Sequence, residues 1–249
     1  MNSPQPIDYA KVMTLDTDRG RYYYYPDFIM GSVTTICDII NKPMLNLWRG
    51  KVGNVLADKI MTDAGTLGTK VHRAVEELDK LLMAKDEEKV IAYAVASPYV
   101  AYLLPYIEWF VREEAEVISC ERLVLHPRFR YCGRCDRVYK LKSYPGKLVV
   151  GDIKTSKMPH IETSLQLSAY TRALLDEGAI PSVGVDGKDG VVLLELHFFH
   201  EKDGAKSLDP LEVEFEFPTF YHFVQGWAWR ERRENATILV GAKEYSVYA

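Results

Sequence analysis

The hydrophobic period of the chain changes near residue 115, and this change restricts the fold more than any other feature of the sequence. Before it, apolar side chains recur at helical spacing, in stretches that we expect to begin near residues 32, 45, 66 and 98. After it, Val117–Leu125, Arg130–Lys142 and Lys147–Thr155 have the composition and period of strands, with a turn at Tyr144-Pro145-Gly146 between the last two. The sequence therefore predicts an antiparallel meander preceded by helices.

The rest of the chain completes one α/β domain. Helical spacing returns over Leu165–Leu175, further strands are expected at Val191–Phe199 and Leu211–Phe217, and a last helix at about 219–235. Because there is no internal repeat or long linker, we predict a single domain over residues 32–249, in which helices flank a mixed β-sheet that contains the meander. Residues 1–31 are expected to form an N-terminal arm with a turn at Pro26-Asp27. The helical stripes expected in the core include Trp48, Val52, Val55, Leu56, Ile60, Val71, Val75, Leu78 and Leu82.

Composition excludes several classes of protein. Hydrophobic residues make up 47% of the 249-residue chain and charged residues 27%, as in globular domains and unlike disordered or fibrous proteins. No apolar run approaches the roughly 18 residues that a membrane span needs, and the first residues resemble neither a signal peptide nor a transit peptide. We therefore expect a cytoplasmic protein without membrane contact. Its cysteines are too few for a disulfide framework and are expected to be reduced: Cys37, Cys120, Cys132 and Cys135.

Charge is distributed unevenly. The net charge is −4, but residues 128–157 carry nine lysines and arginines against two aspartates, a local charge of +7 that leaves −11 for the remainder. Such a segment favours a binding site for a polyanion, although the same charges also suit a hairpin whose basic side chains point into solvent. Charge alone does not decide between these two interpretations.

Asp152-Ile153-Lys154, at the end of an apolar strand, has the pattern of a hydrolytic site. Alternate residues of a strand share a face, so Asp152 and Lys154 project together while Ile153 points into the core. A carboxylate can hold a divalent cation, and a nearby ammonium group can position the attacking water. The alternative interpretation of such a tripeptide is a salt pair at the surface.

Other residues can join this pair. Asp136 lies on the strand that the Pro145-Gly146 turn pairs with the Asp152 strand, and the Ile153 carbonyl offers one more oxygen ligand. His72 on the third helix adds a nitrogen ligand, so that the site would accept Mn²⁺ as well as Mg²⁺. Gln166 and Tyr170 share one face of the helix that follows the Asp152 strand. Taken singly, His72 also suits a core or surface histidine, and the last two residues a partly polar helix face.

In chain order these residues form the set GTxGxxxH, GxxD, DxK and QxxxY, carried by Gly65-Thr66-Leu67-Gly68 with His72, by Gly133 with Asp136, by Asp152 with Lys154, and by Gln166 with Tyr170. The set resembles the PD-(D/E)XK nuclease superfamily in its RecB/Cas4-like branch. GDIKTSKMP, SLQLSAY and GSVTTICDIINKPMLNLWRG resemble in particular the mitochondrial genome maintenance exonucleases and related phage exonucleases. The resemblance covers about residues 30–176 and implies a restriction-endonuclease-like core.

The resemblance implies a function and a role for each residue. His72, Asp136, Asp152 and the Ile153 carbonyl would bind Mg²⁺ or Mn²⁺, Lys154 would be the catalytic lysine, and Gln166 with Tyr170 would support that lysine or the DNA backbone. The expected activity is that of a metal-dependent deoxyribonuclease, an exonuclease acting on free single-stranded DNA ends in recombination, replication or repair, in a bacterium or a phage-infected cell. A recombination or replication protein is the expected partner. A structure-selective or sequence-selective endonuclease and a catalytically silent DNA-binding recombination module remain alternatives.

The resemblance also directs attention to the DNA contacts. We expect them from Arg130, Arg134, Arg137, Lys157 and Tyr170. The tyrosine run Tyr22–Tyr25 either stacks on single-stranded bases or packs on the domain as a strand, and Glu76 and Glu121 are either accessory acids or solvated side chains. Related nucleases hold an iron–sulfur cluster with three cysteines after the nuclease core, whereas this chain has none beyond Cys135, so we expect no such cluster.

Overall fold

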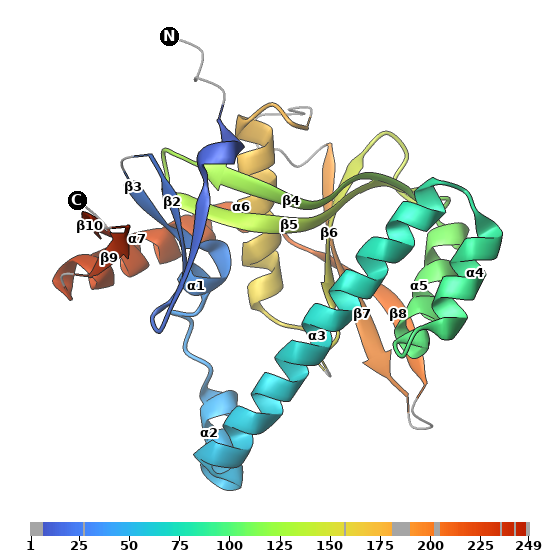
Figure 1. The fold of residues 1–249 in the computed structure, drawn as a ribbon, viewed down its shortest axis with the longest axis horizontal. Coiled ribbons are helices and arrows are strands. Elements are labelled where there is room, and N and C mark those ends of the chain that lie inside the picture. The colour runs from blue at the N-terminus through green and yellow to red at the C-terminus, as the bar shows by residue number, and fades with distance from the viewer. Residues whose placement is uncertain are drawn as a thin grey trace.

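The computed structural model describes residues 7–26, 28–156, 158–180, 190–201, 205–234, 236–241 and 243–247. Among them is a mixed sheet of eight strands in the order β1-β2-β3-β5-β6-β7-β8, with β4 along the other edge of β5 (Figure 1). The pairs β3·β5 and β6·β7 are parallel and the others antiparallel. The strands are β1 (Met13–Thr17), β2 (Gly20–Tyr25), β3 (Phe28–Ser32), β4 (Glu116–His126), β5 (Tyr131–Lys140), β6 (Leu148–Lys154), β7 (Val191–His200) and β8 (Lys206–Val213).

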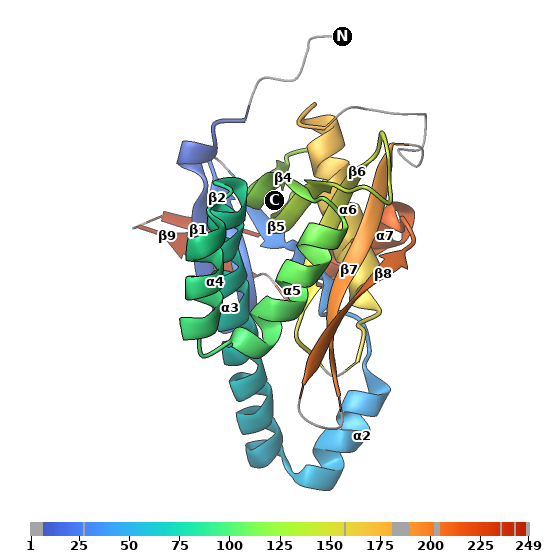
Figure 2. The same cartoon turned by 90° about the vertical axis from the view of Figure 1, so that its right-hand side faces the viewer.

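Helices cover both faces of this sheet, as Figure 2 shows. One hydrophobic cluster joins α1, α6 and α7 to one face, and a second joins α3, α4 and α5 to the other. The predicted mixed α/β fold with flanking helices is confirmed at this level. The helices are α1 (Val33–Cys37), α2 (Pro43–Val52), α3 (Asn54–Met83), α4 (Glu87–Ala96), α5 (Val100–Arg112), α6 (Glu162–Asp176) and α7 (Phe217–Arg233), after a short 3-10 helix η1 (Tyr9–Lys11).

Most of the predicted N-terminal arm forms strands of the main sheet. Strands β1, β2 and β3 extend the main sheet, and β3 pairs with the start of β5. Tyr22 and Tyr23 are buried, because they point to opposite faces of β2 and each packs into a different hydrophobic cluster. Of the two interpretations of the tyrosine run, strand packing is therefore the one that the structure confirms. Of the predicted turn at Pro26-Asp27, Asp27 lies outside the described residues.

The second and third predicted helices differ from expectation. A helix does not begin after Gly65; instead α3 runs without interruption through Gly65 and Gly68 over 30 residues. Its first half and α2 extend away from the sheet (Figures 1 and 2), so part of the predicted core stripe lies at the surface. Val55, Leu56 and Ile60 are 87%, 52% and 43% exposed, whereas Val71, Val75 and Leu78 are buried as predicted.

The C-terminal part holds two further differences. The strand expected at Leu211–Phe217 is β8, which ends at Val213, because Phe217 and Pro218 begin α7 and proline suits the first turn of a helix. A two-stranded sheet of β9 (Thr237–Val240) and β10 (Lys243–Ser246) was not predicted. None of the described helices is long and apolar enough to span a bilayer.

Candidate functional site

The candidate site lies where β5 and β6 separate. β6 pairs with β5 from Val149 to Gly151, and β3 pairs with β5 only at Tyr131 and Cys132. Among the described pairings, residues 133–136 of β5 therefore have no strand partner on that edge. Asp136 fills the gap with its side chain, because its Oδ2 accepts a hydrogen bond from the Ile153 amide at 3.1 Å. A carboxylate thus replaces the backbone carbonyl that a continuous ladder would supply.

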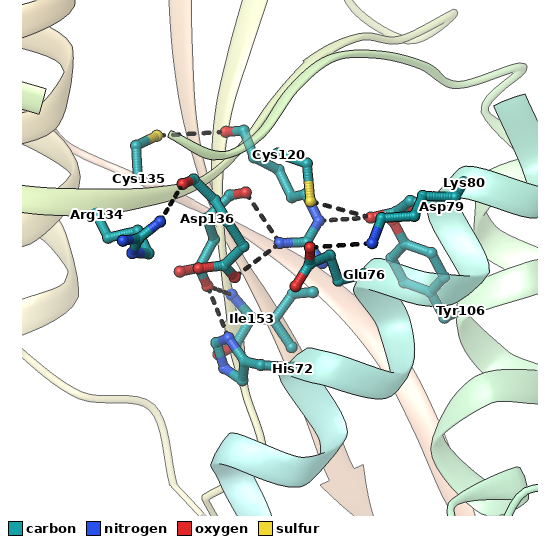
Figure 3. A network of polar contacts seen from close by, with 12 residues as sticks. His72, Glu76, Asp79, Lys80, Tyr106, Cys120, Arg134, Cys135, Asp136 and Ile153 are labelled. Carbon is teal, nitrogen blue, oxygen red and sulfur yellow. Dashed lines mark hydrogen bonds and ion pairs between the residues drawn. The ribbon is translucent and has the colours of Figure 1, made fainter. Parts of the chain in front are cut away.

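Helix α3 supplies an imidazole to the same gap. His72 Nε2 lies 2.7 Å from the Ile153 carbonyl oxygen, and Nδ1 lies 3.2 Å from Asp136 Oδ2. Figure 3 shows His72 pointing from α3 toward Asp136 and Ile153. The structure therefore brings together three groups that the sequence predicts as metal ligands: the side chains of His72 and Asp136 and the Ile153 carbonyl.

Glu121 is the acid that sequence reasoning left without an assignment. On β4 it lies opposite Asp136, since the register pairs Cys120 with Arg137 and Arg122 with Cys135. The ligand atoms of His72, Glu121 and Asp136 lie within 4.8 Å of one another. Glu121 adopts φ = 48°, a left-handed conformation that is uncommon and costs free energy in a residue other than glycine.

Asp152 and Lys154 form the other half of the site. Asp152 Oδ2 lies 2.5 Å from Lys154 Nζ, and that ammonium donates a hydrogen bond to Gln166 Oε1 of α6 at 3.2 Å. The pKa of Asp152 is raised to about 6, because burial and the neighbouring Asp136 carboxylate together outweigh the lowering effect of Lys154. Burial alone would lower the pKa of Lys154, but the carboxylates around it, Asp152 foremost, together outweigh burial, so the net shift is upward.

Tyr170 lies behind the site rather than on its open side. A Cβ at Gly133 would approach Tyr170 Cε1 to 2.6 Å, so the aromatic ring fits against β5 only because that position is glycine. The side chain is 5% exposed and belongs to the core. Tyr170 therefore supports the floor of the site and offers little surface for the DNA contact that the sequence predicts.

The donor set fits a hard or borderline divalent cation. Carboxylate and carbonyl oxygens suit Mg²⁺, and one imidazole nitrogen also suits Mn²⁺. Burial raises the pKa of Glu121, and the negative charge of Asp136 raises it as well. The same charge also contributes to the raised pKa of Asp152. Crowded, partly desolvated carboxylates of this kind are stabilised by a nearby positive charge. His72, Glu121, Asp136 and the Ile153 carbonyl could hold the ion, with Asp152 beside them.

The predicted DNA contact at Arg137 is wrong. Its side chain is fully buried, with Nε 2.6 Å from Asp79 Oδ2 and Nη1 3.2 Å from Glu121 Oε1. The Tyr106 hydroxyl donates to the same Asp79 carboxylate at 2.6 Å. Arg137 points to the face of the sheet that α3 and α5 cover, so it neutralises a buried acid and holds Glu121 instead of reaching solvent.

Much of the remaining basic stretch is also paired. Lys140 lies 3.2 Å from Glu116, and Lys142 pairs with Glu114. Arg134 is exposed near the site, where Nη1 donates to the Glu121 carbonyl at 2.8 Å. Arg130 precedes β5, six residues or about 20 Å along the strand from Asp136. Lys157 lies outside the described residues.

The cysteines lie apart from the site's ligand group. All four are free thiols. Cys135 and Cys132 belong to different hydrophobic clusters, as expected for strand residues an odd number of positions apart. In the part of the chain that the structure describes, His72, Glu121 and Asp136 form the group of metal-ligating side chains.

Comparison with known proteins adds little to this geometry. No family model and no curated protein matches the sequence. Among solved structures, the chain is similar to that described as "Crystal structure of SSO0001", with a TM-score of 0.34 and 14% sequence identity over 78% of this chain and 72% of that chain. A similarity of this size supports no argument about function.

Proposed function

We propose that the protein is a metal-dependent deoxyribonuclease that hydrolyses phosphodiester bonds, with a PD-(D/E)XK core of the RecB-like branch. The observation that supports this most strongly is the convergence of four predicted motifs on one gap in the sheet. His72 comes from α3, Asp136 from β5, Asp152 and Lys154 from β6, and Gln166 from α6. Isolated salt pairs at the surface would not bring residues from four such distant elements into contact with one another.

The chemistry follows from the positions of these groups. When bound, Mg²⁺ or Mn²⁺ offsets the negative charge that builds on the phosphate oxygens during hydrolysis. Asp136 is fixed for ligation by the Ile153 amide, and His72 by its contact with the Ile153 carbonyl. The Lys154 ammonium, held between Asp152 and Gln166, can orient the attacking water or interact with the phosphate.

The preferred substrate in this proposal is a free end of single-stranded DNA, processed in recombination, replication or repair. Arg134 can contact a DNA phosphate beside the site, because its side chain is exposed. A hydrogen bond from its guanidinium to the Glu121 carbonyl holds it next to the ligand group. Arg130 would contact the strand farther along. An endonuclease on the same core remains the second candidate, and a closed circular substrate distinguishes the two.

The test uses end-labelled linear single-stranded DNA and a covalently closed circle of the same sequence, each incubated in Mg²⁺ or Mn²⁺ and, as a control, in EDTA. We expect the wild type to degrade only the linear substrate, and only with metal. The Asp152→Ala variant should lose this activity while it keeps its circular dichroism spectrum. Cutting of the circle would establish the endonuclease, and no cleavage in either metal would contradict the proposal.

A further inference from the structure

Strand β7 carries two ionisable residues in an otherwise apolar sequence. It is buried along most of its length, and Val191–Phe198 are all apolar except Glu195 and His197. These side chains are 1% and 0% exposed, and His197 Nδ1 lies 2.6 Å from Glu195 Oε1. His197 Nε2 has no hydrogen-bond partner among the described residues. A buried acid and imidazole cost free energy that valine or leucine would not.

The two residues lie beside the candidate site. β7 runs parallel to β6, and the register pairs Asp152 with Glu195 and Lys154 with His197. Val150 and Leu193 belong to the cluster on the α6 side of the sheet, so residues 152, 154, 195 and 197 share that side with them. Neighbouring strands are about 4.8 Å apart. Glu195 and His197 therefore lie on the same face of the sheet as Asp152 and Lys154, and directly beside them in the strand register.

Acidic and basic side chains alternate among the four residues. On β6 the acid Asp152 precedes the base Lys154, and on β7 the acid Glu195 precedes the base His197. Lys154 thus has a carboxylate on its own strand at 2.5 Å and a second carboxylate on the next strand, whose negative charge acts on the ammonium. His197 fixes the Glu195 carboxylate from the other side.

We propose that Glu195, held by His197, is a positioning residue for Lys154. The inference rests on the proposed function, in which Asp152 shares its charge with a divalent cation. Lys154 then needs another negative group to keep its ammonium in place, and Glu195 is the acid that the adjacent strand provides. The pair acts through Lys154 and has no contact with the phosphate of its own.

A purely structural pair would behave differently. Replacement of both partners of a buried hydrogen-bonded pair by apolar residues of similar size is often neutral or stabilising. The Glu195→Leu/His197→Phe double variant should therefore keep or raise the midpoint of thermal unfolding while it loses turnover. If the pair served stability alone, the same variant would unfold at a lower temperature. Its kcat per folded molecule would then equal that of the wild type.

The kinetic test compares Glu195→Gln with the wild type on a linear single-stranded oligonucleotide. We expect kcat to fall by about 10- to 100-fold, as for other residues that orient an active-site group. KM should change by less than about threefold, since substrate binding is not altered. Glu212→Gln is the matched control, because Glu212 is an exposed glutamate on the neighbouring strand β8 and should retain wild-type kcat.

A second readout needs neither metal nor activity. The measurement uses metal-free protein that carries Asp152→Asn in every sample, because Asp152 itself holds Lys154 at 2.5 Å when no cation shares its charge. With ¹³C at the lysine ε-carbons, the Lys154 signal is assigned with Lys154→Arg. A held side chain gives two distinct Hε shifts, and these should merge in Glu195→Gln and in Glu195→Leu/His197→Phe. Distinct shifts in the variants, or a wild-type kcat in Glu195→Gln, would overturn the inference and leave the proposed function intact. An inactive wild type would instead overturn the proposed function, and the Hε shifts would then decide the positioning of Lys154 by themselves.

Discussion

Arg134 and Arg137 lie three residues apart on β5 and have opposite environments. Arg137 is buried against Asp79 and Glu121, whereas Arg134 is exposed beside the site. Arg137→Met leaves Asp79 as an unpaired buried charge, which should lower the free energy of unfolding by about 3–5 kcal/mol. Arg134→Met should leave stability unchanged and weaken binding to single-stranded DNA. Urea denaturation and fluorescence anisotropy measure the two effects, and a stable Arg137→Met variant with impaired DNA binding would contradict the assignment.

At the same scale, spacing along the chain predicted much of the site. Asp152 and Lys154 share a strand face, Asp136 follows from the hairpin, and Gln166 follows from the next helix, so local periodicity and one turn were sufficient. Glu121 was not assigned, because its place depends on the β4–β5 register and on a left-handed backbone conformation, which a single sequence does not specify. Arg137 was misassigned since its buried partner, Asp79, lies 58 residues away.

At the scale of elements, α3 shows how packing overrides local propensity. Glycine in a helix interior costs about 0.5–1 kcal/mol relative to alanine, which is why the sequence predicts a helix start after Gly65. The structure continues the helix through that position, and a Cβ there would have no heavy atom within 4 Å. Gly65→Ala should therefore raise the free energy of unfolding by about 0.5–1 kcal/mol in urea denaturation. A destabilised Gly65→Ala variant would show that the chain bends or frays there. Strands β4, β5, β6 and β7 were predicted close to their observed bounds, since their period is local. The exposure of Val55 and Leu56 depends instead on what α2 and α3 pack against.

For the whole molecule, the distribution of charge limits how DNA can bind. The local charge of +7 in residues 128–157 overstates the free positive charge, because Arg137, Lys140 and Lys142 pair with acids from β4, α3 and the turn after α5. The Lys140→Ala/Lys142→Ala variant should therefore keep wild-type affinity for single-stranded DNA and the same salt dependence. Arg134→Ala should reduce the slope of log K against log salt by about 0.7, the value for one phosphate contact on a single strand. Affinity measured at several salt concentrations tests both expectations, and a smaller slope in the double lysine variant would assign the DNA contact to the hairpin instead.

The central claim is that α3, β4, β5 and β6 together build one divalent cation site. Its most direct test is a titration with Mn²⁺, in which electron paramagnetic resonance measures the free ion. We predict that the wild type binds Mn²⁺, that Asp136→Asn binds it at least about 10-fold more weakly, and that Asp63→Asn, an exposed acid on α3, matches the wild type. Equal affinity in the wild type and Asp136→Asn would contradict the site and, with it, the proposed hydrolysis.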